Sequence, residues 1–484
     1  MVKKSKHSPK SILSELQAKG KKYKGKEFWQ IHPTNGKPII DPALLREFLI
    51  ANGFAKLNFF SGFIYVKKTY NIVEHLTSQD VFNYCLGYVN VQNKKNLTSE
   101  FIVQGERHII SKIALLGSLP ELEIQQYKDT IETSHYFFEN TVVRVSSKGI
   151  KVLTYNKFQK LNKFIFKSQI IKRTFDKEAS NKSQIKKFFK LITNSKEHYL
   201  NVLTAIGYLL HKYKNPSVAK AVVISDLLSQ ATNNPHGRSG KGLVVKAISE
   251  LLNVVEYNGK NLDLRRDKFV YQSIEPDTDL FVIQDVSRGF DFEDLFSSIT
   301  DRMNIEKKHT KKVIIDFSNS PKIAITTNYT IPNSSDSYKD RKQLIILNNY
   351  FNAHNKPEHE FKNLFFSQWN VSEYQAFDTF MMKCLQLYLK HGLTHYDDPD
   401  LRRQNLIANT SKEFVELMEN EYNSKKEYYN VKDLANKLDI SSQEQSVRSR
   451  VASQWLQLYA DFKNLKYDSR TSGGITKFRL SKEK

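Results

Sequence analysis

Cysteine is scarce in this chain, with only Cys85 and Cys384 among 484 residues. Two thiols so far apart exclude a cysteine-based zinc site and a disulfide framework, and such usage is typical of a reducing compartment. We expect both to be buried core thiols. Long hydrophobic runs are also missing, because no uninterrupted apolar stretch reaches the ~18 residues of a membrane span. The lysine-rich N-terminus is not followed by an apolar segment, which argues against a secretory signal.

Acidic residues are outnumbered, with 51 Asp and Glu against 74 Lys and Arg, a formal net charge of +23. Hydrophobic residues make up 40% and aromatic residues 12%, so most of the chain is expected to fold, into two to four domains. A basic excess in a chain of this kind points first to nucleic acid. An anionic membrane surface is the rival partner, but no spanning segment supports it.

A polymerase-type metal centre is missing from residues 28–180. No Asp-x-Asp pair lies there on a strand with a later histidine, and the pair Asp277 and Asp279 further on reads as a polar strand entry. The region instead predicts a small α+β domain. Its expected elements are strands Phe28–Ile31 and Phe59–Val66, helices Pro42–Asn52 and Ser78–Val89, and a hairpin of Val142–Val145 with Gly149–Tyr155.

What the chain does contain is a strand, a glycine-containing loop with a lysine, and a helix. The apolar strand is Ala219–Ser225 and the helical pattern is Leu243–Leu252. Between them, glycines allow backbone N–H groups to surround phosphate oxygens, the helix N-terminus adds positive potential, and a lysine reaches the β- and γ-phosphates. The expected nucleotide-binding residues are Gly237, Arg238, Ser239, Gly240, Lys241 and Gly242. Taken alone, the loop is equally well explained as a βα turn with a surface lysine.

Three further apolar strands carry polar residues at their ends. Leu280–Ile283 is followed by Asp285, Lys322–Thr326 by Asn328, and Gln343–Leu347 is preceded by Arg341. Alternation of such strands with helices such as Asp291–Asp301 predicts an α/β sheet covered on both faces. In such sheets the ligand lies beyond the carboxyl ends of the strands.

Each of these polar residues suits phosphoryl transfer. A carboxylate at Asp285 can hold Mg²⁺ and help orient the attacking water, while Asn328 can bind the γ-phosphate or position that water. A guanidinium at Arg341 can stabilise the transferred phosphoryl group from a neighbouring subunit. The alternatives are a turn-forming aspartate, a turn asparagine and a solvated surface arginine.

A basic cluster lies between the second and third of these strands. It comprises Lys307, Lys308, His309, Lys311 and Lys312, and β-like segments flank it. The pattern predicts a hairpin whose tip grips a nucleic-acid backbone. A solvated charge run is the alternative.

Flanking regions complete the predicted organisation. We expect a basic tail (1–27), the N-terminal α+β domain (28–180), a helical collar (181–215), the ATPase domain (216–350), a helical lid (351–400) and a winged-helix-like domain (401–484). For the last, the expected order is helix Glu413–Tyr422, helix Val431–Leu438, helix Ser446–Leu458 and a β-ribbon around Gly473.

Together, these motifs resemble the Walker A, Walker B, motif C and arginine-finger elements of superfamily 3 helicases. The stretches are Gly237–Gly242, Val282–Val286, Pro321–Tyr329 and Asp340-Arg341. The likeness is to the phage- and plasmid-type primase–helicase (poxvirus-like) branch and covers roughly residues 180–395. It implies an AAA+-like P-loop ATPase core that acts as a homo-hexameric ring on single-stranded DNA, with ATP and Mg²⁺. By the same resemblance, Lys308 and His309 are the DNA-gripping pair.

The resemblance also implies a cellular setting and partners. A replicative helicase of a phage, plasmid or similar element would be cytoplasmic, in a bacterial or phage-infected cell. Its partners would be single- and double-stranded DNA and a primase or other replication proteins, and no membrane.

Three departures bear on hydrolysis more than on nucleotide binding. Gly242 replaces the Mg²⁺-binding hydroxyl, Gln284 replaces one Walker B acid, and Asp340 stands where many relatives have a second arginine. They keep open a second hypothesis, an ATP-binding replication initiator or scaffold with little or no hydrolysis. A third, a P-loop kinase or unrelated NTPase, is disfavoured by the basic hairpin and the C-terminal pattern.

Overall fold

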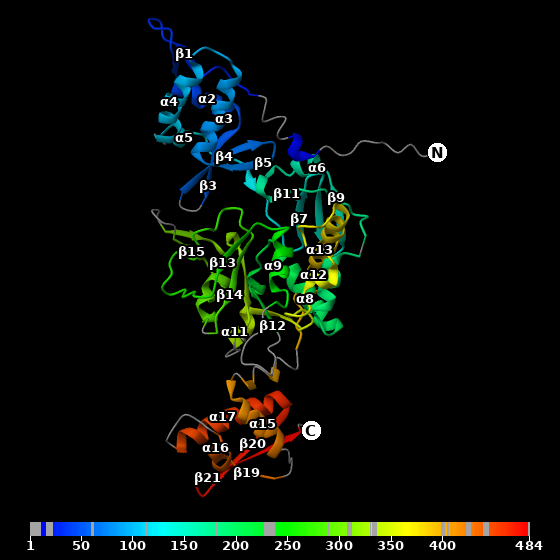
Figure 1. Cartoon of the computed structure of the whole chain (residues 1–484). Coiled ribbons are helices and arrows are strands. Elements are labelled where there is room, and N and C mark those ends of the chain that lie inside the picture. Colours follow the sequence, from blue (N-terminus) through cyan, green and yellow to red (C-terminus); the bar gives the residue numbers. More distant parts are fainter. Residues whose placement is uncertain are drawn as a thin grey trace, which may run out of the picture.

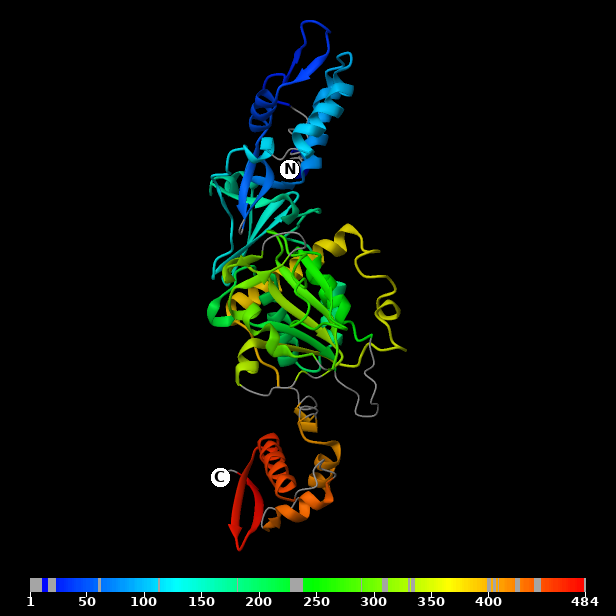
Figure 2. The same cartoon turned by 90° about the vertical axis from the view of Figure 1, so that its left-hand side faces the viewer.

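The structure is a computed structural model. It describes residues 11–15, 23–59, 62–111, 114–180, 182–226, 238–288, 290–306, 312–329, 331, 336–397, 402–403, 406–407, 409–422, 427–438 and 445–482. Three bodies follow one another along the chain: a blue one, a central one coloured from cyan through green to yellow, and one coloured orange to red in Figure 1, and Figure 2 shows them from the side. Most of the predicted basic tail lies outside the described residues. Among those described, no helix has the length and apolarity to cross a bilayer.

The first body has an aromatic core formed by Phe28, Phe48 and Phe101 among others. Its helix α2 begins after Asp41, whose side chain accepts hydrogen bonds from two backbone N–H groups, and α3 begins with a capping box of Thr77 and Asp80. The elements are β1 (Trp29–Ile31), β2 (Pro38–Ile40), α2 (Pro42–Ala51), β3 (Phe54–Phe59), β4 (Gly62–Thr69), β5 (Ile72–Leu76), α3 (Ser78–Val91), α4 (Leu97–Gly105), η1 (Glu106–Ser111) and α5 (Ala114–Gly117).

One predicted strand in this body is wrong. The stretch Phe59–Val66 is not continuous, because β3 ends at Phe59 and β4 begins at Gly62, and the two strands pair antiparallel. Because apolar residues flank this chain reversal on both sides, the hydrophobic pattern of the sequence looked like that of one continuous strand. The predicted helices and the hairpin of residues 142–155 are confirmed within a few residues.

The hydrophobic core is continuous across residue 180, where the sequence placed a domain boundary. Tyr136, Phe138 and Val143 belong to the same cluster as Ile185 and Leu209. The elements before that point are β6 (Gln125–Gln126), β7 (Thr133–Phe138), β8 (Thr141–Ser146), β9 (Gly149–Leu153), α6 (Tyr155–Gln159), β10 (Lys163–Phe166), η2 (Lys167–Gln169) and β11 (Ile170–Ile171). Together with β3, β4 and β5, they form two sheets, with the strand orders β3-β4-β5-β10-β6 and β11-β7-β8-β9. The domain boundaries themselves remain predictions.

A pair of helices forms the predicted collar, α7 (Gln184–Leu191) and α8 (Lys196–Leu210), followed by the turn η3 (Pro216–Val218). Helix α8 crosses α13 (Val371–His391) closely at Gly207. A Cβ there would lie 2.2 Å from the backbone oxygen of Cys384, so only glycine permits the contact. Cys85 and Cys384 are both buried and unpaired, as expected.

The central sheet is parallel, as predicted. Its strands are β12 (Ala221–Asp226), β13 (Val254–Asn258), β14 (Leu280–Val286), β17 (Lys322–Thr327) and β18 (Lys342–Leu347), in the order β13-β14-β17-β12-β18. Alternate residues enter different cores: Val222 and Ile224 join the cluster of α8 and α13, whereas Val223 joins the opposite one. Both faces are therefore covered. The sequence missed β13, an edge strand that buries little of its surface.

The remaining elements of the central body are α9 (Lys241–Ser249), η4 (Phe292–Leu295), α10 (Phe296–Thr300), β15 (Met303–Ile305), β16 (Val313–Ile315), η5 (Phe317–Asn319), α11 (Asp336–Arg341) and α12 (Pro357–Phe361). The predicted helix Asp291–Asp301 is a 3₁₀ turn followed by one short α-helix. In the predicted helical lid (351–400), the long helix α13 begins only at Val371, and the side chain of Asn370 caps its start. Residues 362–370 are irregular.

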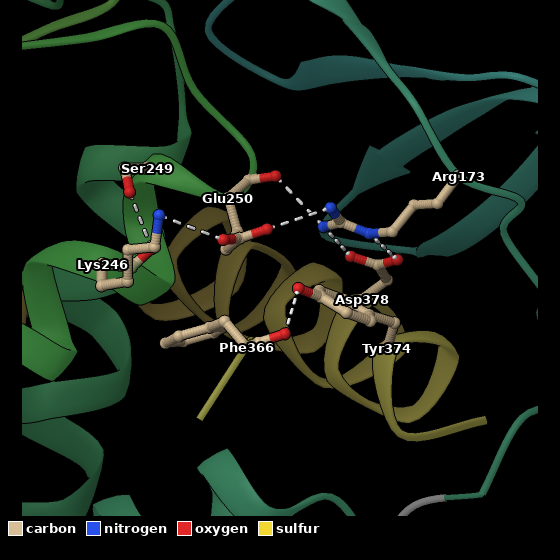
Figure 3. A network of polar contacts seen from close by, with 7 residues as sticks. All are labelled: Arg173, Lys246, Ser249, Glu250, Phe366, Tyr374 and Asp378. Atoms are coloured by element: carbon tan, nitrogen blue, oxygen red, sulfur yellow. Dashed lines mark hydrogen bonds and ion pairs between the residues drawn. The ribbon is translucent and has the colours of Figure 1, made fainter. Parts of the chain in front are cut away.

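A buried ion-pair network braces the far end of α9 (Figure 3). Arg173 donates to both oxygens of Asp378, at 2.8 and 2.7 Å, and to the side chain and backbone of Glu250, at 3.3 and 3.1 Å. The guanidinium also lies 4.9 Å from the ring centre of Tyr374. Burial raises the pKa of Asp378 to about 6, against the opposing effect of Arg173. The network ties three separate segments together behind the sheet.

The third body has its own core, which includes Phe414, Leu434, Leu456 and Phe478. Its elements are α15 (Lys412–Glu421), β19 (Tyr429–Asn430), α16 (Val431–Lys437), α17 (Gln445–Lys463), β20 (Leu465–Ser472) and β21 (Ile475–Lys482). Three helices and then a β-hairpin turning at Gly473-Gly474 occur in the predicted order, with β19 added to the ribbon.

Candidate functional site

Helix α9 begins at Lys241, whose side chain reaches the carboxyl end of β12. Gly240 precedes it with a φ of 103°, a left-handed conformation that favours glycine. A Cβ at Gly240 would lie 2.7 Å from the ring of Phe188, so the loop is pressed against the collar. At Gly242 a Cβ would meet nothing within 4 Å. The residues from Arg238 to Gly242 thus form a tight loop entering a helix, as predicted, while Gly237 lies outside the described residues.

The ammonium group of Lys241 is held by two strand tips. It forms an ion pair with Asp226 at the end of β12 and donates to Asn328 Oδ1 at 2.5 Å, just past β17. Ser239 donates its hydroxyl to the same Asp226 carboxylate. Both Lys241 and Asp226 are buried. The predicted strand ended at Ser225, one residue short of Asp226. An acid at the end of a strand, the signal that singled out Asp285, could have identified Asp226 as well.

Asp285 lies at an irregularity in β14. The register with β17 shifts between Ile283 and Val286, and Asp285 has a φ of 54°. Its backbone N–H donates to Thr326 Oγ1 at 2.8 Å, and its side chain is exposed. A bulge of this kind re-aims one side chain, and left-handed backbone at a non-glycine residue is strained. Asp285 lines a cavity that Lys241 also lines.

Gln284, the residue before Asp285, forms hydrogen bonds through both the oxygen and the nitrogen of its side-chain amide. Its Oε1 accepts from Thr326 Oγ1 at 2.8 Å, and its Nε2 donates to Glu256 Oε2 at 3.0 Å. Thr326 therefore connects the neighbouring strands at both Gln284 and Asp285. The hydroxyl of Thr326 is a second polar group that sequence reasoning missed.

A cavity of about 710 Å³ brings these residues together. Its lining includes the loop Arg238–Leu243 and the strand-end residues Gln284, Asp285, Thr326 and Asn328. Residues of the segment Lys356–Phe365, predicted only as part of a lid, supply the rest of the lining. The predicted loop, the strand-end carboxylate and the strand-end amide therefore share one site. Their individual roles remain predictions.

Arg341 lies at the amino ends of the parallel strands, away from the carboxyl ends where Lys241 lies. In the parallel pairing of β12 with β18, Lys342 is opposite Ala221, whereas Leu347 is opposite Asp226. At roughly 3.3 Å per residue, the start of β18 is about 17 Å from the edge that bears Lys241. Arg341 stacks at 4.8 Å over Phe296, and its buried Nε has no hydrogen-bond partner. It cannot reach the cavity of its own chain.

The strands that flank the predicted basic cluster are present. Strands β15 and β16 pair antiparallel, with Ile305 opposite Val313. Of the cluster, Lys312 is described and exposed, whereas Lys307, Lys308, His309 and Lys311 lie outside the described residues.

Buried lysines gather at the amino edge of the sheet. Lys322 donates to the backbone oxygens of Tyr208 and His211 at 2.6 and 2.5 Å, and burial lowers its pKa. Burial also lowers the pKa of Lys214 to about 7, where it donates to Ser320 Oγ at 2.7 Å. Asp279, the predicted polar strand entry, is half-buried, and desolvation raises its pKa to about 6. These groups line or adjoin a second cavity of about 690 Å³.

Within the described part of the chain, no group of three or more His, Cys, Asp or Glu side chains is arranged to hold a metal ion. The cavity lining instead offers two exposed carboxylates, Asp285 and Glu358, beside hydroxyl and amide oxygens. Mg²⁺ commonly binds proteins through one or two carboxylates, together with water and substrate phosphates. The donor set fits such an ion only when a phosphate accompanies it.

No protein-family model matches the chain, and no curated protein sequence matches it. Solved structures with some similarity include the apo C-terminal region of NrS-1 (residues 305–718), with a TM-score of 0.40, 14% identity, and coverage of 92% of this chain and 99% of that one. The A form of the same region has a TM-score of 0.38, 13% identity, and coverage of 92% and 100%. A JCV helicase bound to a thiazolopyridine compound has a TM-score of 0.24, 14% identity, and coverage of 56% and 64%. These likenesses are too distant to assign a family, so the function must be argued from the chain's own residues.

Proposed function

We propose that the chain is an ATP-dependent DNA helicase that serves replication of a phage, plasmid or similar element. The observation that supports this most is the meeting of Lys241, Asp285 and Asn328 at the carboxyl edge of one parallel sheet, beside a glycine loop that opens a helix. Backbone N–H groups, a helix N-terminus and a buried lysine together favour a polyphosphate. A mere βα turn with a surface lysine would not bury that lysine between two strand tips.

In this proposal Lys241 exchanges Asp226 for the β- and γ-phosphates. Asn328, already in contact with Lys241, is placed to bind the γ-phosphate or the attacking water. Mg²⁺, held through Asp285, would supply charge neutralisation for the phosphates. Thr326 fixes the backbone of Asp285 and so keeps the carboxylate directed at the cavity.

The position of Arg341 favours action between subunits. Its guanidinium is on the opposite edge of the sheet from its own cavity, so it can serve only the site of a neighbour. A closed ring, for which we propose six subunits, satisfies this for every site. The net charge of +23 and the hairpin β15–β16 would then place lysines on single-stranded DNA inside the ring. The C-terminal body would act as a winged-helix contact to duplex DNA.

A second function is favoured by the engagement of Gln284. Its amide is committed to Thr326 and Glu256, and no carboxylate stands at that position to activate water. A chain that binds ATP, assembles on DNA and hydrolyses little would be a replication initiator or scaffold.

The deciding experiment measures ATP binding and steady-state ATPase with and without single-stranded DNA, for the wild type and Lys241→Ala. The helicase proposal expects DNA-stimulated turnover that Lys241→Ala abolishes together with binding. The scaffold alternative expects ATP-dependent assembly on DNA without turnover. Undiminished ATPase in Lys241→Ala would contradict the assignment of the loop.

A further inference from the structure

The part of the cavity wall formed by residues 356–365 carries an unsatisfied polar atom. Asn363 Oδ1 is buried and has no hydrogen-bond partner, and the residue lines the cavity. Buried acceptors are normally paired, so this oxygen gains a hydrogen bond when a rotation of the side chain brings it to the cavity, where a ligand donor can meet it. Beside it, Leu364 also lines the cavity and is 52% exposed, an unusual position for a large apolar side chain within a concave site.

The backbone around these two residues is strained. Lys362 has a φ of 58° and Phe366 a φ of 66°, left-handed conformations that are uncommon for a lysine and a genuine outlier for a bulky phenylalanine. Such strain persists only where the surroundings enforce it, and it clusters at binding sites. Here Leu364 both donates its N–H to Gln368 Oε1, at 2.7 Å, and accepts from the Gln368 N–H at its carbonyl, at 3.1 Å. These two hydrogen bonds fix the backbone of the loop, whose residues Asn363, Leu364 and Phe365 line the cavity.

This wall is also fixed relative to the phosphate loop. Phe188 lies against Gly240, and its ring meets the edge of Phe365 with centroids 5.9 Å apart. Phe365 in turn contacts Phe361 at 4.7 Å and Trp369 at 5.3 Å. One aromatic cluster thus supports both walls, so a ligand anchored at Lys241 meets Asn363 and Leu364 at a defined distance.

We propose that Asn363 and Leu364 are the base-recognition wall of this cavity and select adenine, an inference that rests on the nucleotide-binding function proposed above. Asn363 Oδ1 accepts from the exocyclic amino group of adenine, and its amide nitrogen donates to the neighbouring ring nitrogen. An asparagine amide matches adenine in this way, whereas guanine presents two acceptors, O6 and N7, at the same edge. Leu364 packs on the face of the ring.

The test measures dissociation constants for ATP and GTP by displacement of an ATP analogue labelled on the ribose, with the full chain. The wild type is expected to favour ATP by about tenfold, the scale of one or two hydrogen bonds. Asn363→Ala should weaken ATP binding by about tenfold, leave GTP unchanged and so erase the preference. Leu364→Ala should weaken both nucleotides alike. Asn349→Ala, an exposed asparagine outside the cavity, should change neither.

Two failures are distinguishable. If Lys241→Ala abolishes binding but Asn363→Ala binds ATP and GTP like the wild type, the base-recognition proposal is wrong and the nucleotide site stands. If the wild type binds no nucleotide, the proposed function fails and the inference with it. Because the Asn363 amide oxygen has no partner in the fold, Asn363→Ala should unfold at the wild-type temperature, which separates a binding effect from misfolding.

Discussion

The carboxylate of Asp226 holds the ammonium group of Lys241 at the tip of β12. A phosphate must compete with this carboxylate for the same lysine, and the carboxylate also repels it. We therefore expect Asp226→Asn to tighten ATP binding by about three- to tenfold, the order of ~1 kcal/mol for one charge-assisted contact. The asparagine can still accept from Ser239, so the loop keeps its anchor. Weaker ATP binding in equilibrium titrations would show that Asp226 assists the nucleotide instead.

Gly242 offers open space where a hydroxyl would normally stand. Gly242→Ser should lower the Mg²⁺ concentration for half-maximal ATPase by about tenfold, because one ligand is added at ~1.4 kcal/mol. Gly242→Ala is the matched control, since it adds the Cβ and the helix propensity without the oxygen. Equal Mg²⁺ responses in the two variants would mean that the metal is held elsewhere.

Arg341 should act on the site of a neighbouring subunit. Arg341→Ala is expected to lower ATPase by about a thousandfold or more with ATP binding retained. Mixing Arg341→Ala with Lys241→Ala subunits should restore part of the activity, because an intact cavity can then adjoin an intact arginine. Lys339→Ala, an exposed residue on the same helix, serves as the control. Absence of any rescue in mixed assemblies would place Arg341 outside the reaction.

Lys214 predicts a rise of stability with pH. Its pKa is lowered by burial to about 7, so between pH 7 and 10.5 the unfolded chain binds the proton that the folded chain has released. The free energy of unfolding must then increase with pH across this window. Urea titrations at pH 7, 8 and 9 should show this increase in the wild type and a smaller one in Lys214→Met. Parallel pH curves for the two proteins would exclude Lys214 as the source.

Arg173 braces the end of the phosphate-loop helix through Asp378 and Glu250 (Figure 3). Arg173→Met should cost about 3–5 kcal/mol of unfolding free energy, because Asp378 would remain buried without its partner. Adding Asp378→Asn to that variant should recover part of the loss. Chemical denaturation measures both, and additive losses would show that the two side chains do not act as a pair.

The sequence alone determined the parallel α/β sheet, because its strands are short, continuous apolar runs that only burial on both faces explains. It also predicted the glycine-containing loop before α9 and the polar residues Asp285 and Asn328, which follow neighbouring strands and line one cavity, while their roles remain predictions. The edge strand β13 was not predicted, because an edge strand needs fewer apolar residues. The turn between β3 and β4 was not predicted either, because apolar residues flank it on both sides.

Only the tertiary structure decided how these residues meet. The pairing of Lys241 with Asp226, the bulge that aims Asp285, and the wall at Asn363 all join segments far apart in the chain, so no local pattern encodes them. The register of β12 with β18 likewise placed Arg341 beyond the reach of its own cavity. Sequence periodicity fixes which residues are buried in each element, whereas the order and register of strands fix which side chains share a site.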